Sequence, residues 1–596
     1  MTYQAPIREQ KFVLETIADI DELSNLPGFG DLSADLVSVI VDEAGKFAED
    51  VWAPLNRVGD EQGAQWNDGT VTLPPGFKEA YGRYVEAGWG SLSAGTEYGG
   101  QGLPFVLSLA VQESLTSANL AFSLCPMLTL GAIEAIEAHA SEELKQTYLP
   151  KVVNGAWAAT MNLTEPQAGS DVGALKTKAE PQPDGTYRIK GQKIFITFGE
   201  HDLSENIVHL VLARTPGAPA GTKGISLFIV PKFLVNPDGT LGARNDLRCV
   251  SIEHKLGIHA SPTCVMSYGD NDGCVGYLVG EENTGMRAMF TMMNHARINV
   301  GLQGVAIAER AYQGAVAYAK ERVQSARLGA ARTPVRIIEH ADVRRMLLTM
   351  KARTEAVRAL TYCNAAAVDR GIHAADEETR KAARGLADLL TPLTKSYATD
   401  TGVEVASLAI QVFGGMGFIE ETGAAQHLRD ARITPIYEGT NGIQALDLVG
   451  RKLPMDGGAH WQKLFTDIRS FTDTLPGDGA VATLKAPLAE AVSSLEEATH
   501  WLVNHANQPD DVAGSATPYQ RLFASVVGAY LLARQAVEAD RRLGAGEAEA
   551  DFLNAKVITA RFYAEQILPQ DVALLGPVTR GADLLYALSE DQFLAA

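Results

Sequence analysis

The stretch ITPIYEGTNGIQ, residues 433–444, places a single carboxylate, Glu438, between an aromatic residue and a glycine. Pro435 disfavours helix in the residue before it, and residues 439–442 have the composition of a turn or a helix start. Glu438 therefore stands where backbone can approach a ligand closely. A capping or surface carboxylate is the simpler interpretation of one Glu near a turn, and the stretch alone does not decide between the two.

The sequence around this turn predicts long helices. Apolar residues at helical spacing fill four alanine-rich runs, 286–324, 337–367, 377–408 and 440–449, which suit a four-helix bundle. Beyond Lys452, apolar stripes at 484–502, 522–537 and 552–562 predict a further helical module. The third of these stripes runs through Phe552, Ala555, Ile558 and Phe562.

The middle of the chain has a different pattern. Short β-rich runs occupy 187–197, 207–213, 225–230 and 263–268, whereas residues from 31 to about 156 again have helical spacing. We therefore expect a mainly α protein with a central β domain. The predicted domains are a helical domain with an extended N-terminus (1–156), a β domain (157–280), a four-helix bundle (281–452) and an additional helical module (453–596).

Composition excludes several classes of protein. The chain has 596 residues, 46% of them hydrophobic, and a formal net charge of −21, which opposes a protein that neutralises nucleic-acid phosphates. Its five cysteines are an odd number without CxxC spacing, so neither a zinc site nor a disulfide framework is expected. The first residues lack a signal-peptide pattern and no run of eighteen apolar residues occurs, which predicts a cytoplasmic protein without a membrane span. Together with the charge and the cysteines, this composition predicts neither a metal nor a nucleic-acid partner.

Four further segments carry polar groups suited to ligand binding, although each also has a plain structural interpretation. LTEPQAGSDV (163–172) clusters hydroxyls and a glycine, and Phe195 and Thr197 share one side of a predicted strand. Arg297 and Arg322 lie in a predicted helix, where a planar guanidinium can bind phosphate. The run QVFGGMGF (411–418) interrupts a helical pattern and permits close approach of a ligand.

Together these segments resemble the acyl-CoA dehydrogenase family, in the family's order and over roughly residues 34–453. The matching motifs are EYGGQG (97–102), LTEPQAGSD (163–171), GQKIFIT (191–197), KLGIHAS (255–261), NHAR (294–297), QVFGGMGF (411–418) and YEGT (437–440). The resemblance implies an N-terminal helical domain, a middle β-barrel and a C-terminal four-helix bundle. It also implies an oxidoreductase that binds FAD and an acyl-CoA.

In that family a carboxylate removes the α-proton of the acyl-CoA while flavin N5 accepts the β-hydrogen as hydride, which gives a trans-2-enoyl-CoA. The resemblance makes Glu438 the base. One branch of the family carries its base on a bundle helix, at the place that Ala296 occupies here. Because alanine cannot accept a proton, Glu438 rather than Ala296 is the candidate for the base.

The resemblance also implies ligand contacts. The expected FAD contacts are Leu163 and Thr164 at the pyrimidine edge, Phe195 and Thr197 on the other side, Thr440 and Asn441 at the adenine end, and Arg322, Gln411 and Gly415 reaching the FAD of a neighbouring subunit. The expected substrate contacts are Ser170, Asn294, Arg297, Tyr437 and Gly439. A site built across subunits implies a homodimer or a higher homo-oligomer.

The extended N-terminus and the C-terminal module resemble a long bacterial branch whose members include an enzyme for 3-(methylthio)propanoyl-CoA. This implies a short- to medium-chain substrate, with the methylthio compound among the candidates, and an electron-transfer flavoprotein as electron acceptor. Two alternatives stay open: a flavin acyl-CoA oxidase of the same fold, and an alkylation-response type DNA-protective flavoprotein. The acidic charge and the lack of a basic cluster beyond Arg541 and Arg542 count against the second.

Overall fold

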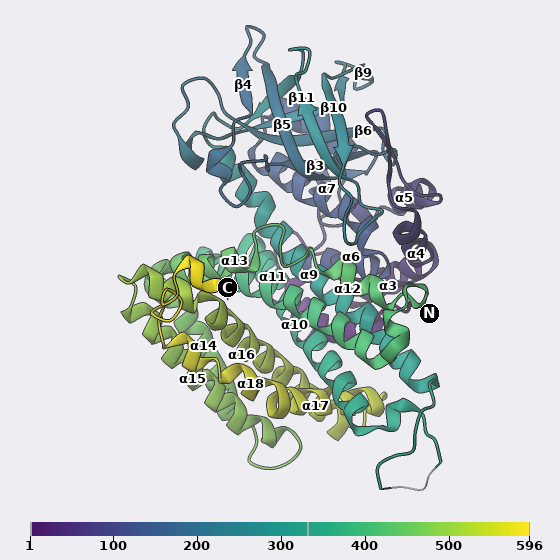
Figure 1. The fold of residues 1–596 in the computed structure, drawn as a ribbon, viewed down its shortest axis with the longest axis vertical. Helices are drawn as coiled ribbons and strands as arrows, with labels where there is room; N and C mark the ends of the chain where they lie inside the picture. Colours follow the sequence, from purple (N-terminus) through teal and green to yellow (C-terminus); the bar gives the residue numbers. More distant parts are fainter. Residues whose placement is uncertain (1–2, 330–332, 595–596) are drawn as a thin grey trace. The chain divides into compact units, whose positions relative to one another are not determined.

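The computed structural model describes residues 3–329 and 333–594 (Figure 1). The chain forms two compact units, which are described separately: Val39–Asn299 makes up almost all of one, and Pro6–Ser38 with Val300–Ala596 almost all of the other. The structure is 61% helical with a central sheet and additional C-terminal helices, which confirms the predicted fold class. The four predicted domain boundaries stay a proposal.

The unit around residues 39–299 combines helices with a sheet. Its apolar helices are α6 (Phe105–Ala118) and α7 (Leu120–His139), and α7 begins where the Asn119 side chain accepts a hydrogen bond from the Phe122 N–H at 3.1 Å. The other helices are α3 (Ala34–Phe47), α4 (Ala53–Gln62), α5 (Phe77–Glu86) and α8 (Glu142–Val153). A hairpin of β1 (Gln65–Asn67) and β2 (Thr70–Thr72) interrupts the predicted helical region at Asp68-Gly69.

The central sheet contains eight strands, in the order β10-β11-β5-β12-β7-β6-β3, with β4 beside β5. Neighbours are antiparallel except β3 and β6. Among the predicted strands, β5 (Tyr187–Thr197) and β11 (Thr263–Tyr268) have the expected bounds, and β6 (Asn206–Ala213) and β7 (Ser226–Pro231) are within one residue of them. The remaining strands are β3 (Trp157–Asn162), β4 (Lys178–Pro181), β10 (Leu247–Ile252) and β12 (Val275–Val279), with a separate pair β8 (Phe233–Val235) and β9 (Leu241–Arg244).

Three long helices dominate the other unit: α9 (Gly285–Glu321, from Val300 onward in this unit), α10 (Ala341–His373) and α11 (Glu377–Phe413). Three of the predicted bundle helices are therefore confirmed. The predicted fourth, 440–449, is shorter: α13 (Asn441–Asp447) runs into a π-helical turn, Leu448–Lys452, and a separate short helix, α12 (Ala424–Ala431), precedes it. Pro435 and Gly439 separate α12 from α13.

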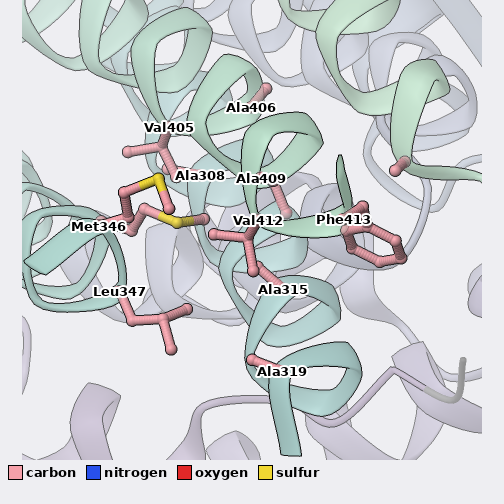
Figure 2. Packing of buried hydrophobic residues seen from close by; sticks show 13 residues of the cluster. Ala308, Ala315, Ala319, Met346, Leu347, Val405, Ala406, Ala409, Val412 and Phe413 are labelled. Atoms are coloured by element: carbon pink, nitrogen blue, oxygen red, sulfur yellow. The ribbon is translucent and has the colours of Figure 1, made fainter. Parts of the chain in front are cut away.

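Small side chains let these helices pack closely (Figure 2). On α9, Ala308, Ala315 and Ala319 face Val405, Ala406, Ala409 and Val412 of α11, with Met346 and Leu347 of α10 beside them. At Gly304 a Cβ atom would lie 2.1 Å from the carbonyl oxygen of Ala398, so only glycine permits this approach of α9 to α11. The core therefore depends on alanine and glycine where two helices meet.

The C-terminal module consists of α14 (Ala459–Thr474), α15 (Lys485–Asn504), α16 (Pro509–Gly544), α17 (Ala550–Phe562), α18 (Leu568–Val572) and α19 (Leu575–Val578). α16 packs against α10, α11 and α13, and against α15 and α17. The predicted stripe on α17 was wrong, because Ile558 is 55% exposed while Leu553, Val557 and Lys556 are buried. The buried face includes a lysine, which apolar spacing cannot reveal.

Within the described part of the chain, three helices are long and apolar enough to cross a membrane by length and composition: Leu120–His139, Glu377–Phe418 and Pro509–Gly544. Of their most apolar stretches, 89%, 44% and 78% respectively are buried inside the protein. Packing thus accounts for much of their apolar surface, and the expected absence of a membrane span stays a prediction.

Candidate functional site

The predicted site residues fall in both units, and each group is described within its own unit. In the first, β3 delivers Leu163 and Thr164 to the end of the sheet, where both are half-buried. The Thr164 carbonyl accepts a hydrogen bond from the Ile194 N–H of β5 at 2.9 Å. The loop after β3 is therefore joined to β5 next to Phe195.

Phe195 lies in an irregular part of β5. The pairing with β11 shifts between Cys264 and Met266, so that Ile194 and Phe195 together oppose Val265, which is a β-bulge. Phe195 has φ +59° and a side chain that is 58% exposed. A left-handed aromatic residue costs about 1 to 3 kcal/mol and is found mainly where surrounding structure and function require it. The ring is thus held outside the core at the end of the strand.

A buried ion pair, which sequence reasoning missed, lies beneath these two segments. The Lys193 Nζ donates to Glu165 Oε1 at 2.8 Å and to the Leu163 carbonyl at 2.9 Å. Glu165 also accepts from the Lys176 N–H at 2.7 Å and from the Thr177 N–H and hydroxyl at 3.0 and 2.6 Å. Both charged side chains are almost fully buried, so the pair ties the loop after β3 to β5.

The charges of this pair shape its titration. Burial alone would raise the pKa of Glu165, but the Lys193 ammonium and the hydrogen bonds outweigh burial and lower the pKa to about 2. Burial lowers the pKa of Lys193 to about 8, although Glu165 opposes this. The sequence did contain a signal: Lys193 stands four residues after the inward-facing Ile189 of β5, where a charge needs a buried partner.

The predicted substrate residues of this unit differ in exposure. Ser170 is exposed, in a loop that the Asp171 side chain holds by accepting from the Gly173 N–H at 2.9 Å. Arg297 and Ala296 are buried, at 6% and 4% exposure. The Asn294 side chain lies outside the described part of the structure.

In the other unit, the loop between α12 and α13 carries Glu438, which is half-buried and has φ +54°. Gly439 follows with φ +82°, and a Cβ there would lie 2.7 Å from Gln444 Nε2. The helix cap is Thr440, whose hydroxyl accepts from the Ile443 N–H at 3.2 Å. The interpretation of Glu438 as the helix cap is therefore wrong. Two successive left-handed residues instead present its side chain from a strained turn.

Neighbouring side chains hold this turn. The Tyr437 hydroxyl donates to Gln303 Oε1 of α9, and Gln444 Nε2 donates to the Glu438 carbonyl at 3.4 Å. Burial raises the pKa of Tyr437 far above its usual value, and the nearby Glu438 carboxylate adds to this. Tyr437 therefore stays a neutral phenol with a fixed ring.

Asn441, a predicted adenine contact, lies against α11. Its Oδ1 accepts from Lys395 Nζ at 2.8 Å, and its Nδ2 donates to Asp400 Oδ1 at 2.8 Å and to Thr399 Oγ1 at 3.1 Å. These bonds take up the hydrogen-bonding groups of the amide, so the side chain anchors α13 to α11. A contact with the adenine end of FAD stays a prediction for Asn441 and for Thr440.

The three residues expected to reach a neighbouring subunit, Arg322, Gln411 and Gly415, are exposed at the ends of α9 and α11. Tyr318 of α9 stacks on Phe413 of α11 with ring centroids 4.4 Å apart, which places these two helix ends side by side. The structure therefore groups Arg322, Gln411 and Gly415 at one end of the bundle.

Among the residues that the structure describes, no group of three or more His, Cys, Asp or Glu is arranged to hold a metal ion. The five cysteines are free thiols, four of them buried.

Comparison with known proteins gives four matching family models. They are the N-terminal domain of acyl-CoA dehydrogenase at residues 38–156, its middle domain at 160–270, its C-terminal domain at 283–453, and an acetyl-CoA dehydrogenase C-terminal-like model at 464–589. The last of these coincides with the C-terminal module.

Individual proteins are similar over nearly the whole chain. A 3-methylmercaptopropionyl-CoA dehydrogenase of Ruegeria pomeroyi is 48% identical over 99% of this chain and 100% of its own length. A butyryl-CoA dehydrogenase of Syntrophomonas wolfei is 39% identical over 95% of each chain. The structure of an acyl-CoA dehydrogenase complexed with FAD from Bacillus anthracis has the same fold, with a TM-score of 0.74, 20% identity and coverage of 99% of this chain and 93% of that one.

Proposed function

Because this chain belongs to the acyl-CoA dehydrogenase family, we propose that it oxidises an acyl-CoA to the trans-2-enoyl-CoA with Glu438 as the base for the α-proton. The observation that carries this assignment is the turn itself: Glu438 and Gly439 are both left-handed, and Thr440 rather than Glu438 caps α13. Left-handed backbone in a non-glycine residue is found mainly where the surrounding structure or function requires it. Ala296, at the alternative position, has no group that accepts a proton.

The described residues fit FAD as the cofactor. The Phe195 ring is exposed at a bulge and can stack on a flat ring system, and the Thr164 and Thr197 hydroxyls offer hydrogen bonds beside it. Leu163 and Thr164 would hold one edge of the flavin, with Phe195 and Thr197 on its other side. FAD, when bound, supplies the acceptor for the β-hydrogen as hydride.

The protein residues handle the proton and the position of the substrate. The α-proton of a thioester is weakly acidic, so the developing enolate oxygen needs hydrogen-bond donors while the Glu438 carboxylate accepts the proton. Gly439 allows backbone to approach this oxygen closely. Tyr437, fixed by Gln303, lines the acyl group, and Ser170, Asn294 and Arg297 bind the CoA portion.

The relatives support a short acyl chain, since they are a 3-methylmercaptopropionyl-CoA and a butyryl-CoA dehydrogenase. We propose 3-(methylthio)propanoyl-CoA and short- to medium-chain acyl-CoA as substrates, and an electron-transfer flavoprotein as acceptor.

The exposed Arg322, Gln411 and Gly415 and the 86% exposed Phe418 support a homodimer or a higher homo-oligomer, in which they meet a second copy. Under this proposal the enzyme acts in the cytoplasm. The family models, which match 38–156, 160–270, 283–453 and 464–589, support a division of the chain into 1–156, 157–280, 281–452 and 453–596.

Replacing Glu438 tests the assignment of the base. Glu438→Gln removes the proton acceptor and nearly preserves the size of the side chain, so we expect the variant to bind FAD normally. When the variant is mixed anaerobically with butyryl-CoA or 3-(methylthio)propanoyl-CoA, its visible flavin absorption should not bleach. Glu421→Gln, an exposed glutamate outside the proposed site, serves as the control and should bleach as the wild type does. Bleaching of the Glu438→Gln flavin at the wild-type rate would show that another group is the base.

A further inference from the structure

We propose that the C-terminal module holds the base loop in place, with Asn441 and Lys395 as positioning residues, through the α11 segment 392–404. This inference rests on the proposed role of Glu438. Asn441 stands three residues after Glu438 and opens α13. Four side-chain hydrogen bonds, two from Asn441 Nδ2 to Thr399 and Asp400 and two to its Oδ1 from Lys395 and Thr399, join it to α11.

Breaking the contact between Asn441 and α11 should be energetically unfavourable because of Lys395. Its side chain is fully buried, and the Asn441 amide oxygen is one of its hydrogen-bond acceptors. A buried ammonium needs such acceptors, since desolvation is otherwise uncompensated. The position of Asn441, and with it the turn at Glu438 and Gly439, is therefore coupled to the position of this segment of α11.

Side chains of α16, in the C-terminal module, contact the same segment of α11. Gln520 Nε2 donates to the Pro392 carbonyl at 3.2 Å, and Ser525 Oγ lies 3.1 Å from the Tyr397 hydroxyl. Arg521 pairs with Glu404 at 2.5 Å. All three contacts lie within the thirteen residues that also hold Asn441.

Two further features favour a bracing role. Pro392 lies inside α11 and cannot donate a backbone hydrogen bond, so α11 lacks one such bond at the start of this segment. The α16 side chains that contact α11 are themselves held in place, because Arg521 Nε and Ser525 Oγ both contact the buried Asp571 of α18, at 2.9 and 2.5 Å. α16 also packs directly against α13. The C-terminal module therefore contacts both α13, the helix that follows Glu438, and α11, to which Asn441 anchors α13.

Single-turnover flavin reduction by butyryl-CoA, followed anaerobically on the full-length holoenzyme, measures this positioning. Asn441→Ala should lower the limiting rate of flavin reduction about 10- to 100-fold, because small displacements of a reacting group cost this much. FAD stoichiometry and the butyryl-CoA concentration at half-maximal rate should not change. Lys395→Met should lower the rate similarly, and the double variant should lose less than the product of the two effects.

A matched pair on α16 separates bracing from general stability. Arg521 and Arg534 are both partly exposed and both pair with carboxylates, but Arg534 contacts Asp19 and the Thr16 carbonyl instead of α11. Arg521→Met should reduce the limiting rate about 2- to 30-fold. Arg534→Met should leave the rate unchanged even if both variants lower Tm.

Several outcomes would overturn the inference. Loss of FAD from Asn441→Ala would assign that side chain to the cofactor instead. Wild-type rates in folded Asn441→Ala, or equal rate losses in the two arginine variants, would leave the module with a stabilising role only. Glu438→Gln is measured alongside: if it remains active, the proposed base is wrong, whereas an inactive Glu438→Gln with an unaffected Asn441→Ala rejects the positioning role alone.

Discussion

At the scale of single residues, the informative groups are those whose backbone or burial is unfavourable in isolation. Phe195 and Glu438 are both left-handed, and Glu165 and Lys193 are charged side chains inside the protein. The sequence predicted the first two as candidates, because Phe195 shares one side of a predicted strand with Thr197 and Glu438 stands between an aromatic residue and a glycine. It missed the ion pair, because Glu165 and Lys193 are 28 residues apart and meet only when the loop after β3 is joined to β5.

The Glu165 carboxylate should make stability depend on acid pH. Its pKa is lowered from 4.5 to about 2 in the folded protein, so its stabilising contribution is complete above pH 4.5 and is lost as the pH falls toward 2. The shift corresponds to about 3 kcal/mol. Urea unfolding of wild type and Glu165→Gln at a series of pH values should therefore show a difference that shrinks over this range. A difference that stays constant down to pH 2 would contradict the lowered pKa.

At the scale of elements, spacing predicts long regular segments well and short irregular ones poorly. The bounds of β5 and β11 follow from runs of residues that favour strands, and α9 to α11 from helical periodicity. The hairpin at Asp68-Gly69 escaped prediction because its strands have three residues each, too few for a periodic signal. The fourth bundle helix is shorter than predicted because its regular part ends at Asp447, where the π-helical turn Leu448–Lys452 follows.

α17 carries a buried charge, Lys556, on the face that packs against other helices. The Lys556 Nζ contacts Glu355 of α10 at 2.7 Å and Glu9 of α1 (Ile7–Thr16) at 2.5 Å, so three helices meet at one ammonium. Lys556→Met would leave two carboxylates without this charge, which should cost roughly 3 to 5 kcal/mol of unfolding free energy.

Thermal or urea unfolding measures this effect, and Lys463→Met is the matched control. Lys463 pairs with Asp467 on the surface of α14, so its loss should cost only about 0 to 1 kcal/mol. Similar destabilisation by both variants would argue against the buried cluster as the contact that holds α1 and α17 to α10.

At the scale of the whole molecule, the mainly α architecture with a central sheet and added helices was predictable, because each region has its own periodicity and the motifs occur in the family's order. The role proposed for the C-terminal module could not be predicted from the sequence, since it depends on which faces of α11 meet α16 and α13. The chain is an acyl-CoA dehydrogenase by family, and we propose that it reacts through Glu438 with a short acyl-CoA.

The most direct measurement is an anaerobic mixing of the purified flavoprotein with butyryl-CoA and with 3-(methylthio)propanoyl-CoA, followed by admission of air. A dehydrogenase should bleach its flavin, form the corresponding trans-2-enoyl-CoA and recover its colour slowly in air. No bleaching with any acyl-CoA, or rapid reoxidation with release of peroxide, would contradict the account.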